Sequence, residues 1–345
     1  FWVLNAVFEK DAKKFLAEHK KGRFWEKAEA EKAFGKKGAK HGTVMKVFSQ
    51  KRTLAKPIPF NTTGFLRTAS AIGLTAGEAM NIAETLYQMG LTSYPRTDNT
   101  VYPKNLDLKA ILQELTKCPE FAPEIEKIFK LGKIEPSAGK ESKDHPPIHP
   151  VSAAPRSKLT DRQWKIYELI VRRFLATLAE DAETMNQAVD IDLDGETFVA
   201  RGQLILKKGW KEFYPYSQLN EVILPPLKER DQVRLDKLEM LEKETEPPAR
   251  YSQGSLIKLM EDSGLGTKAT RHEIIKKLYA RAYIHGLKAL EPNEIAFSVT
   301  AVLEQYASDL TKPKMTAELE KEMDLIAAGK KTKQEVVENS RKFLL

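Results

Sequence analysis

Cysteine is almost absent from this sequence, since Cys118 is the single one among 345 residues. One thiol can form neither a disulfide within the chain nor a cysteine zinc cluster, and it fits a reducing compartment. Long apolar runs are missing too, so we expect no membrane span and no membrane partner. The chain opens on FWVLNAVF, without a methionine, and reads like the middle of a strand. We therefore expect a piece of a longer polypeptide.

What is present is an ordinary globular composition with a modest excess of positive charge. Apolar residues make up 41% and charged residues 30%, which excludes the signature of disorder. Lysine and arginine number 56 against 48 acidic residues, a formal net charge of +8. The excess suits a polyanionic partner, and a solvated basic surface is the alternative. The length predicts two or three domains.

Alternating patterns on both sides of a helical stretch predict a discontinuous β domain. Residues 1–60 read as strands around a basic loop, FGKKGAKHG, and alternation returns at 181–246 with a hairpin turn at 194–195. Residues 61–180 and 247–345 read as helical, apart from a short hairpin near 283 to 298. We predict an α+β multidomain fold: a β arch domain, an inserted helical domain and a helical, winged-helix-like domain.

Capping patterns mark the helices of the insertion. Thr75 with Glu78 forms a capping box, and Gly90 stands where that helix should end. Thr160 with Gln163 opens another box before an apolar face of roughly five turns.

Directly after the first of these helices, the stretch LTSYPRTDNTVYP places Tyr94, Arg96 and Asp98 at alternate positions. Its proline favours extended backbone over residues 92–98, in which alternate side chains share a face. A phenol has a reference pKa near 10, so a nucleophilic tyrosine needs positive charge nearby. Arg96 can supply it and bind phosphate, with Asp98 placed to orient the guanidinium. An ordinary ion pair on a surface turn is the alternative.

A second loop, DHPPIHP, presents His145 and His149 between prolines that stiffen the backbone. A histidine near neutral pKa can donate to a phosphate oxygen or carry a proton. Metal binding is a weaker interpretation because no third ligand stands nearby, and an ordinary loop histidine also remains possible.

A third stretch, from YSQGSLIKLMEDSGLGTKATRHEII onward, has a helix-turn-helix outline. One helix should end near Ser263, and Thr270 with Glu273 forms a third capping box. Lys268, Thr270 and Arg271 would then lie at a helix N-terminus, which favours a phosphate. Many helix pairs have no role with nucleic acids, so the outline alone leaves both readings open.

Together these stretches resemble the type IA DNA topoisomerases. Four stretches occur in the family's order and approximate spacing: SYPRTDN, HPPIHP, PFNTTGFLRTAS and GLGTKATRHEII. The residues YPR and HPPIHP resemble archaeal more than bacterial members, and the resemblance covers nearly the whole chain. It implies a toroidal core in which residues 1–60 with 181–246 form domain II, 61–180 the gate domain III and 247–345 part of domain IV.

The resemblance also implies site residues. The catalytic tyrosine corresponds to Tyr94, the scissile-phosphate arginine to Arg96, the phosphate-contacting histidine to His145 and the following acid to Asp98. Strand contacts fall near Thr270, with Lys268, Arg271 and His149 as further DNA-binding candidates. Bacterial relatives tend to have a glutamate and an arginine where Pro146 and His149 stand, which puts those two roles in doubt.

The implied reaction is transient cleavage of single-stranded DNA through a 5′-phosphotyrosine, with strand passage and no ATP. The family's acidic Mg²⁺-binding Toprim domain and cysteine zinc ribbons are not recognisable, because no Asp-x-Asp-x-Glu run occurs. We therefore expect Mg²⁺ in the complete enzyme with ligands outside this chain, no metal site within it, and little activity of the chain alone. The expected partners are single-stranded and underwound DNA and the missing Toprim domain, in a cytoplasmic, nucleoid-associated protein. The alternatives are a non-catalytic single-stranded DNA-binding module, or a recombinase or relaxase.

Overall fold

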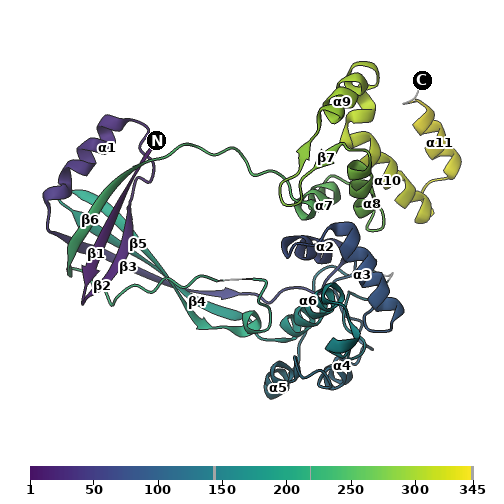
Figure 1. The fold of residues 1–345 in the computed structure, drawn as a ribbon, viewed down its shortest axis with the longest axis horizontal. Coiled ribbons are helices and arrows are strands. Elements are labelled where there is room, and N and C mark those ends of the chain that lie inside the picture. The colour runs from purple at the N-terminus through teal and green to yellow at the C-terminus, as the bar shows by residue number, and fades with distance from the viewer. Residues whose placement is uncertain (143–144, 218, 343–345) are drawn as a thin grey trace. The chain divides into compact units, whose positions relative to one another are not determined.

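The protein divides into two compact units. The computed structural model describes residues 1–142, 145–217 and 219–342 (Figure 1). The units are Phe1–Lys56 with Glu180–Pro248, and Pro57–Ala179 with Ala249–Leu345. The two helical stretches that the sequence suggests as separate domains therefore group into one unit, and their assignment to separate domains stays a prediction.

The first unit is a closed barrel of antiparallel strands. In barrel order these are β1 (Trp2–Lys10), β2 (Lys13–His19), β5 (Glu196–Lys207), β4 (Ala182–Leu193), β3 (His41–Leu54) and β6 (Gln232–Glu242). Strand β6 pairs with both β1 and β3 and so closes the sheet. Strands from before and after the helical stretch thus form one barrel, where the sequence suggests an arch.

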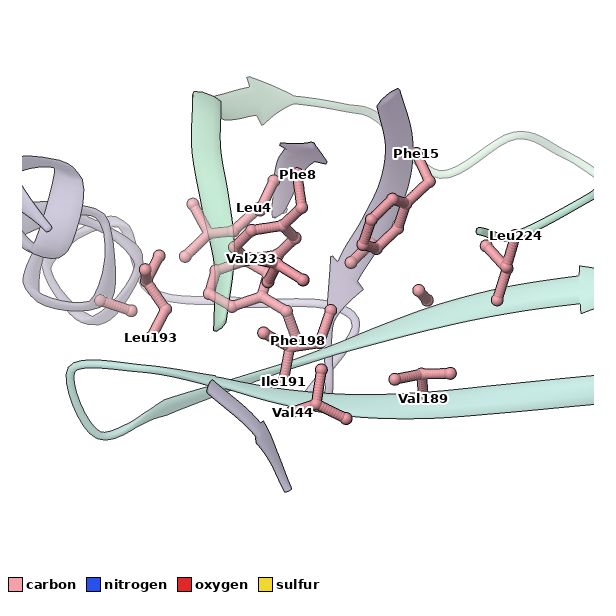
Figure 2. Packing of buried hydrophobic residues seen from close by; sticks show 14 of the residues in the cluster. Leu4, Phe8, Phe15, Val44, Val189, Ile191, Leu193, Phe198, Leu224 and Val233 are labelled. Carbon is pink, nitrogen blue, oxygen red and sulfur yellow. The ribbon is translucent and has the colours of Figure 1, made fainter. Parts of the chain in front are cut away.

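Alternate side chains of these strands fill the barrel (Figure 2). The ring of Phe8 lies 6.0 Å from that of Phe15 and 6.3 Å from that of Phe198, and all three are buried. Strands β4 and β5 are joined at Asp194 and Gly195, whose φ angles of 53° and 89° form the predicted two-residue hairpin turn.

One helix lies where the sequence suggests strands and a loop. Helix α1 (Lys27–Phe34) is followed by the 3-10 turn η1 (Gly35–Gly38), which carries part of the expected basic loop. Alanine, glutamate and lysine dominate α1, and these are strong helix formers. Ala30 and Ala33 belong to the buried cluster that fills the barrel, so this helix contributes to the same core.

The second unit begins with five helices. They are α2 (Thr62–Ala71), α3 (Ala76–Gln88), α4 (Leu108–Leu115), α5 (Ala122–Lys130) and α6 (Asp161–Leu178). The predicted capping box at Thr160 and Gln163 is present at the start of α6, whose apolar face is buried. At α3, Thr75 accepts the backbone N–H of Glu78, but the Glu78 carboxylate pairs with Arg162 instead of completing the box. The tertiary ion pair between Glu78 and Arg162 thus replaces the local side-chain bond of the capping box.

The remaining elements form the rest of the second unit. They are α7 (Gln253–Asp262), α8 (Arg271–Ala280), β7 (Ile284–His285), β8 (Glu291–Pro292), α9 (Glu294–Tyr306), η4 (Ser308–Thr311), α10 (Pro313–Ala327) and α11 (Lys333–Lys342). The predicted hairpin exists as the pair β7 and β8, but it is shorter than expected because α9 already begins at Glu294. None of the helices within the described ranges is both long and apolar enough to cross a membrane.

Candidate active site

The tyrosine segment, residues 92–98, follows helix α3 directly. Gly90 has a φ of 72°, in the left-handed region that glycine adopts easily, and it ends the helix as predicted. Buried and more exposed side chains then alternate, and Tyr94, Arg96 and Asp98 belong to the more exposed set. This is the pattern that extended backbone produces, so the three side chains point away from the core.

The N-terminus of α2 holds this segment in place. The Thr62 N–H donates to Thr97 O at 2.9 Å, and the Thr97 N–H donates to Thr62 Oγ1 at 2.9 Å. The Thr62 hydroxyl in turn donates to Pro95 O at 2.8 Å. Thr62 and Thr97 are both buried, so these bonds are shielded from water. Thr62, from the PFNTTGFLRTAS stretch, thus fixes the backbone beside Tyr94.

The histidine loop contributes an exposed imidazole next to the tyrosine. The ring of His145 lies 4.9 Å from that of Tyr94 in an edge-to-face arrangement. Tyr87, on the last turn of α3, contacts Tyr94 with its ring centroid 5.2 Å away. The Thr97 hydroxyl donates to His145 O at 2.9 Å, which ties the two loops together. The sequence placed Tyr94 and His145 in one site, and the structure brings them into contact.

The other loop histidine has a different environment. His149 is 3% exposed, and its Nδ1–H donates to Pro147 O at 2.7 Å. Burial lowers the pKa of His149, which favours the neutral ring. Its edge faces Tyr102, and its backbone N–H donates to Ser93 Oγ. The ring of His149 therefore lies in the core of the loop, which does not favour direct contact with DNA, and the DNA-binding role of His149 stays a prediction.

The carboxylate that orients Arg96 is not the one predicted. Arg96 donates to Glu84 Oε1 through Nε at 2.7 Å, and Nη2 lies 2.6 Å from the same oxygen. Asp98 instead lies 3.5 Å from Lys268 Nζ, and the described residues show no bond between Asp98 and Arg96. The reason is the chain reversal at Gly90, which brings the last turns of α3 beside the tyrosine segment.

Thr270 does not form the predicted capping box. It stands at the N-cap of α8, but with helical φ and ψ of −109° and −25°, and its side chain caps nothing in that helix. Its hydroxyl instead accepts the Thr267 N–H at 2.8 Å and closes the preceding turn. A helical backbone conformation at the N-cap points the side chain away from the amides that it would otherwise cap.

Arg271 is used within its own turn. Nε donates to Leu265 O at 3.1 Å and Nη2 to Gly266 O at 2.8 Å, and the side chain is 11% exposed. Its Nη1 also lies 3.7 Å from Glu261, which accepts the Thr63 hydroxyl. In this structure Arg271 thus bonds to the turn that carries Lys268, and its predicted contact with a DNA phosphate stays a prediction.

A cavity of about 620 Å³ is lined by residues of α3, α7 and α8, by the start of α6 and by the turn between β7 and β8. His272 lines it and is 1% exposed, and its ring nitrogens have no hydrogen-bond partner among the described residues. Burial and the nearby Arg96 charge lower the pKa of His272. Sequence reasoning missed both Glu84 and His272, because no local motif marks a residue whose importance arises from packing.

The described residues include no group of three or more histidine, cysteine, aspartate or glutamate side chains that could hold a metal ion. The described side chains around Tyr94 therefore do not fit a Mg²⁺ site by themselves.

The comparisons with known proteins agree with this fold. A full-length topoisomerase I from Thermotoga maritima has a similar structure, with a TM-score of 0.80 at 24% identity, and the match covers 100% of this chain and 58% of that one. This likeness establishes the fold, with its mixed helices and strands.

Sequence comparison identifies the family. A family model described as DNA topoisomerase matches residues 1–338. The DNA topoisomerase 1 of Archaeoglobus fulgidus is 51% identical over 335 residues, covering 96% of this chain and 49% of that protein. That of Thermoplasma acidophilum is 39% identical over 345 residues, covering 100% and 44%. The chain belongs to the type IA DNA topoisomerase family, and it spans about half the length of these curated relatives.

Proposed function

We propose that this chain is the tyrosine-bearing part of a type IA DNA topoisomerase that cleaves and reseals single-stranded DNA. The observation that supports this most directly is that Tyr94 and Arg96 lie at alternate, more exposed positions of the tyrosine segment, with the ring of His145 4.9 Å from that of Tyr94. Family membership does not favour the alternative of a non-catalytic DNA-binding module, or that of a recombinase or relaxase.

In the proposed reaction, the Tyr94 phenolic oxygen attacks a backbone phosphorus. The phenol gives up its proton as a phosphorus–oxygen bond to the tyrosine forms. The bond to the 3′-oxygen breaks, and that oxygen keeps the electron pair and takes up one proton, so the reaction neither gains nor loses protons overall. Arg96 stabilises the charge on the phosphate oxygens, and His145 donates a hydrogen bond or carries a proton. One phosphodiester replaces another, so resealing is the reverse reaction and requires no ATP.

Strand binding is assigned to the turn before α8. Lys268 would contact a phosphate, because a lysine attracts anions. The Thr270 N–H already donates to Thr267 O at 3.1 Å, so Thr270 would contribute by shaping the turn beside Lys268. Asp98, which pairs with Lys268 in the structure, would compete with DNA for that charge. Arg271 would act indirectly by holding the turn.

The larger arrangement is also part of the proposal. The barrel would be domain II, residues 61–180 the movable gate domain III, and residues 247–345 part of domain IV of a ring. Mg²⁺ and its acidic ligands would come from a Toprim domain elsewhere in a longer polypeptide, in keeping with relatives about twice the length of this chain. Single-stranded and underwound DNA would be the substrates.

The test is to incubate this chain, and the longer protein that contains it, with Mg²⁺ and end-labelled single-stranded DNA. A denaturation-resistant adduct on Tyr94, identified by mass spectrometry, is expected for the longer protein, and Tyr94→Phe should abolish both adduct and relaxation. An adduct on another tyrosine, or full relaxation by this chain alone, would refute the mechanism.

A further inference from the structure

The Arg96 guanidinium is held along one edge by a single carboxylate. Glu84 Oε1 lies 2.7 Å from Nε and 2.6 Å from Nη2, so one oxygen accepts from two adjacent donors. Both side chains are about one-third exposed, at 28% for Arg96 and 30% for Glu84. Two charge-assisted hydrogen bonds of this length hold the plane of a guanidinium more firmly than a single hydrogen bond would.

The opposite edge of Arg96 is much less engaged. A guanidinium carries five N–H donors, and Glu84 uses two of them. Among the described residues, the other contact is that of Nη1 with Ala269 O at 3.5 Å, which is a long hydrogen bond. The remaining edge, formed by Nη1 and Nη2, is the one that could bind two phosphate oxygens.

We propose that Glu84 is a positioning residue, which aims the free edge of Arg96 at the phosphate that Tyr94 attacks; this rests on the proposed function. A carboxylate at this distance also partly neutralises the arginine. Glu84 therefore has two opposed effects: it weakens the attraction of Arg96 for DNA in the ground state, and it holds the guanidinium in the geometry that the transition state needs.

These opposed effects give Glu84 a signature that a merely structural residue would lack. Glu84→Gln removes the charge and should leave single-stranded DNA affinity unchanged or raise it a few-fold. The same change should slow cleavage about tenfold to a hundredfold, because small errors in the position of a reacting group are costly. Glu84→Asp keeps the charge on a shorter side chain, so affinity should match the parent while cleavage still slows.

The experiment uses the longer protein that contains this chain. Affinity is measured by fluorescence anisotropy in a Tyr94→Phe background, and cleavage by the single-turnover rate of adduct formation at saturating DNA. Glu78→Gln is the matched control, because Glu78 lies on the same helix and also pairs with an arginine, Arg162. The control should leave both measurements within about twofold of the parent protein.

Retained or tighter binding with at least tenfold slower cleavage in Glu84→Gln supports the proposal. Cleavage within twofold of the parent protein overturns it, as does a parallel loss of binding and cleavage in both Glu84 variants. Failure of the parent protein itself to form an adduct on Tyr94 would instead overturn the proposed function.

Discussion

The buried hydroxyl of Thr97 should stabilise the candidate site much more than that of its neighbour Thr92. Thr97 is 0% exposed, and its hydroxyl donates to His145 O at 2.9 Å and accepts the Asn99 N–H at 3.0 Å. Thr97→Val keeps the shape of the side chain but leaves the Asn99 N–H and the His145 carbonyl without this hydrogen-bond partner. Losing the partner of a buried group costs about 1–3 kcal/mol of folding free energy, and the loss is smaller for the carbonyl because water reaches it in part. The sum is about 2–4 kcal/mol.

Thr92 provides the matched control. It is 2% exposed, and its hydroxyl has no hydrogen-bond partner among the described residues. Thr92→Val removes an unsatisfied polar atom, so it should be neutral or stabilise by about 1 kcal/mol. Thermal unfolding should therefore show a Tm about 4–16 °C lower for Thr97→Val and the same or slightly higher for Thr92→Val.

The functional consequence follows the same contrast. Thr97→Val releases the backbone of His145 from the tyrosine segment, so in the longer protein adduct formation should slow even at temperatures where the variant remains folded. Thr92→Val should not slow it. Equal Tm changes in the two variants, or a stabilised Thr97→Val, would show that these hydrogen bonds do not hold the site together.

Four further outcomes are expected. Anisotropy at matched ionic strength should show tighter binding of single-stranded than duplex DNA, and equal binding would contradict the proposed strand site. Lys268→Ala should weaken binding and lower the salt slope by about one, whereas Arg271→Ala should mainly lower the Tm, since its guanidinium holds carbonyls of its own turn. Tyr94→Phe should abolish the adduct with binding nearly unchanged; lost binding would argue against a purely chemical role. Burial lowers the pKa of His149 and His272 below the unfolded value of about 6.5, so the unfolded state binds protons first and stability should fall as pH drops below about 6.5. Between pH 7.5 and 5.5 the free energy of urea unfolding should fall less for His272→Leu than for the parent protein. An equal fall in both would show that His272 does not contribute to the pH dependence.

Local signals were enough for much of the fold. The α6 capping box, the helix end at Gly90 and the turn at Asp194 each depend on neighbouring residues, and all were predictable. The alternating runs before and after the helices also predicted strands that meet in one sheet. Helix α1 was missed because its amphipathic pattern is short and lies next to a basic, glycine-rich stretch.

The side-chain partners in the site were less predictable. The sequence suggests that Tyr94, Arg96 and Asp98 share a face, but the choice between Glu84 and Asp98 as partner of Arg96 depends on how α3 folds back. His149 and Arg271 have the chemistry of DNA contacts in the sequence, yet the structure uses both inside loops. Burial of a polar side chain depends on packing between distant segments, which spacing along the chain does not reveal.

The pairing of β3 with β4 gives the helical insertion a simple topology. These strands stay paired up to the insertion, and the last pair is Leu54 with Ala182. The chain leaves the barrel after Leu54 and re-enters it at Ala182, and residues 57–179 between them belong to the second unit. The stretch that carries Tyr94 is therefore an enlarged hairpin loop. A short turn could close the same hairpin without changing the strand register, so the pairing of β3 with β4 does not depend on how residues 57–179 fold.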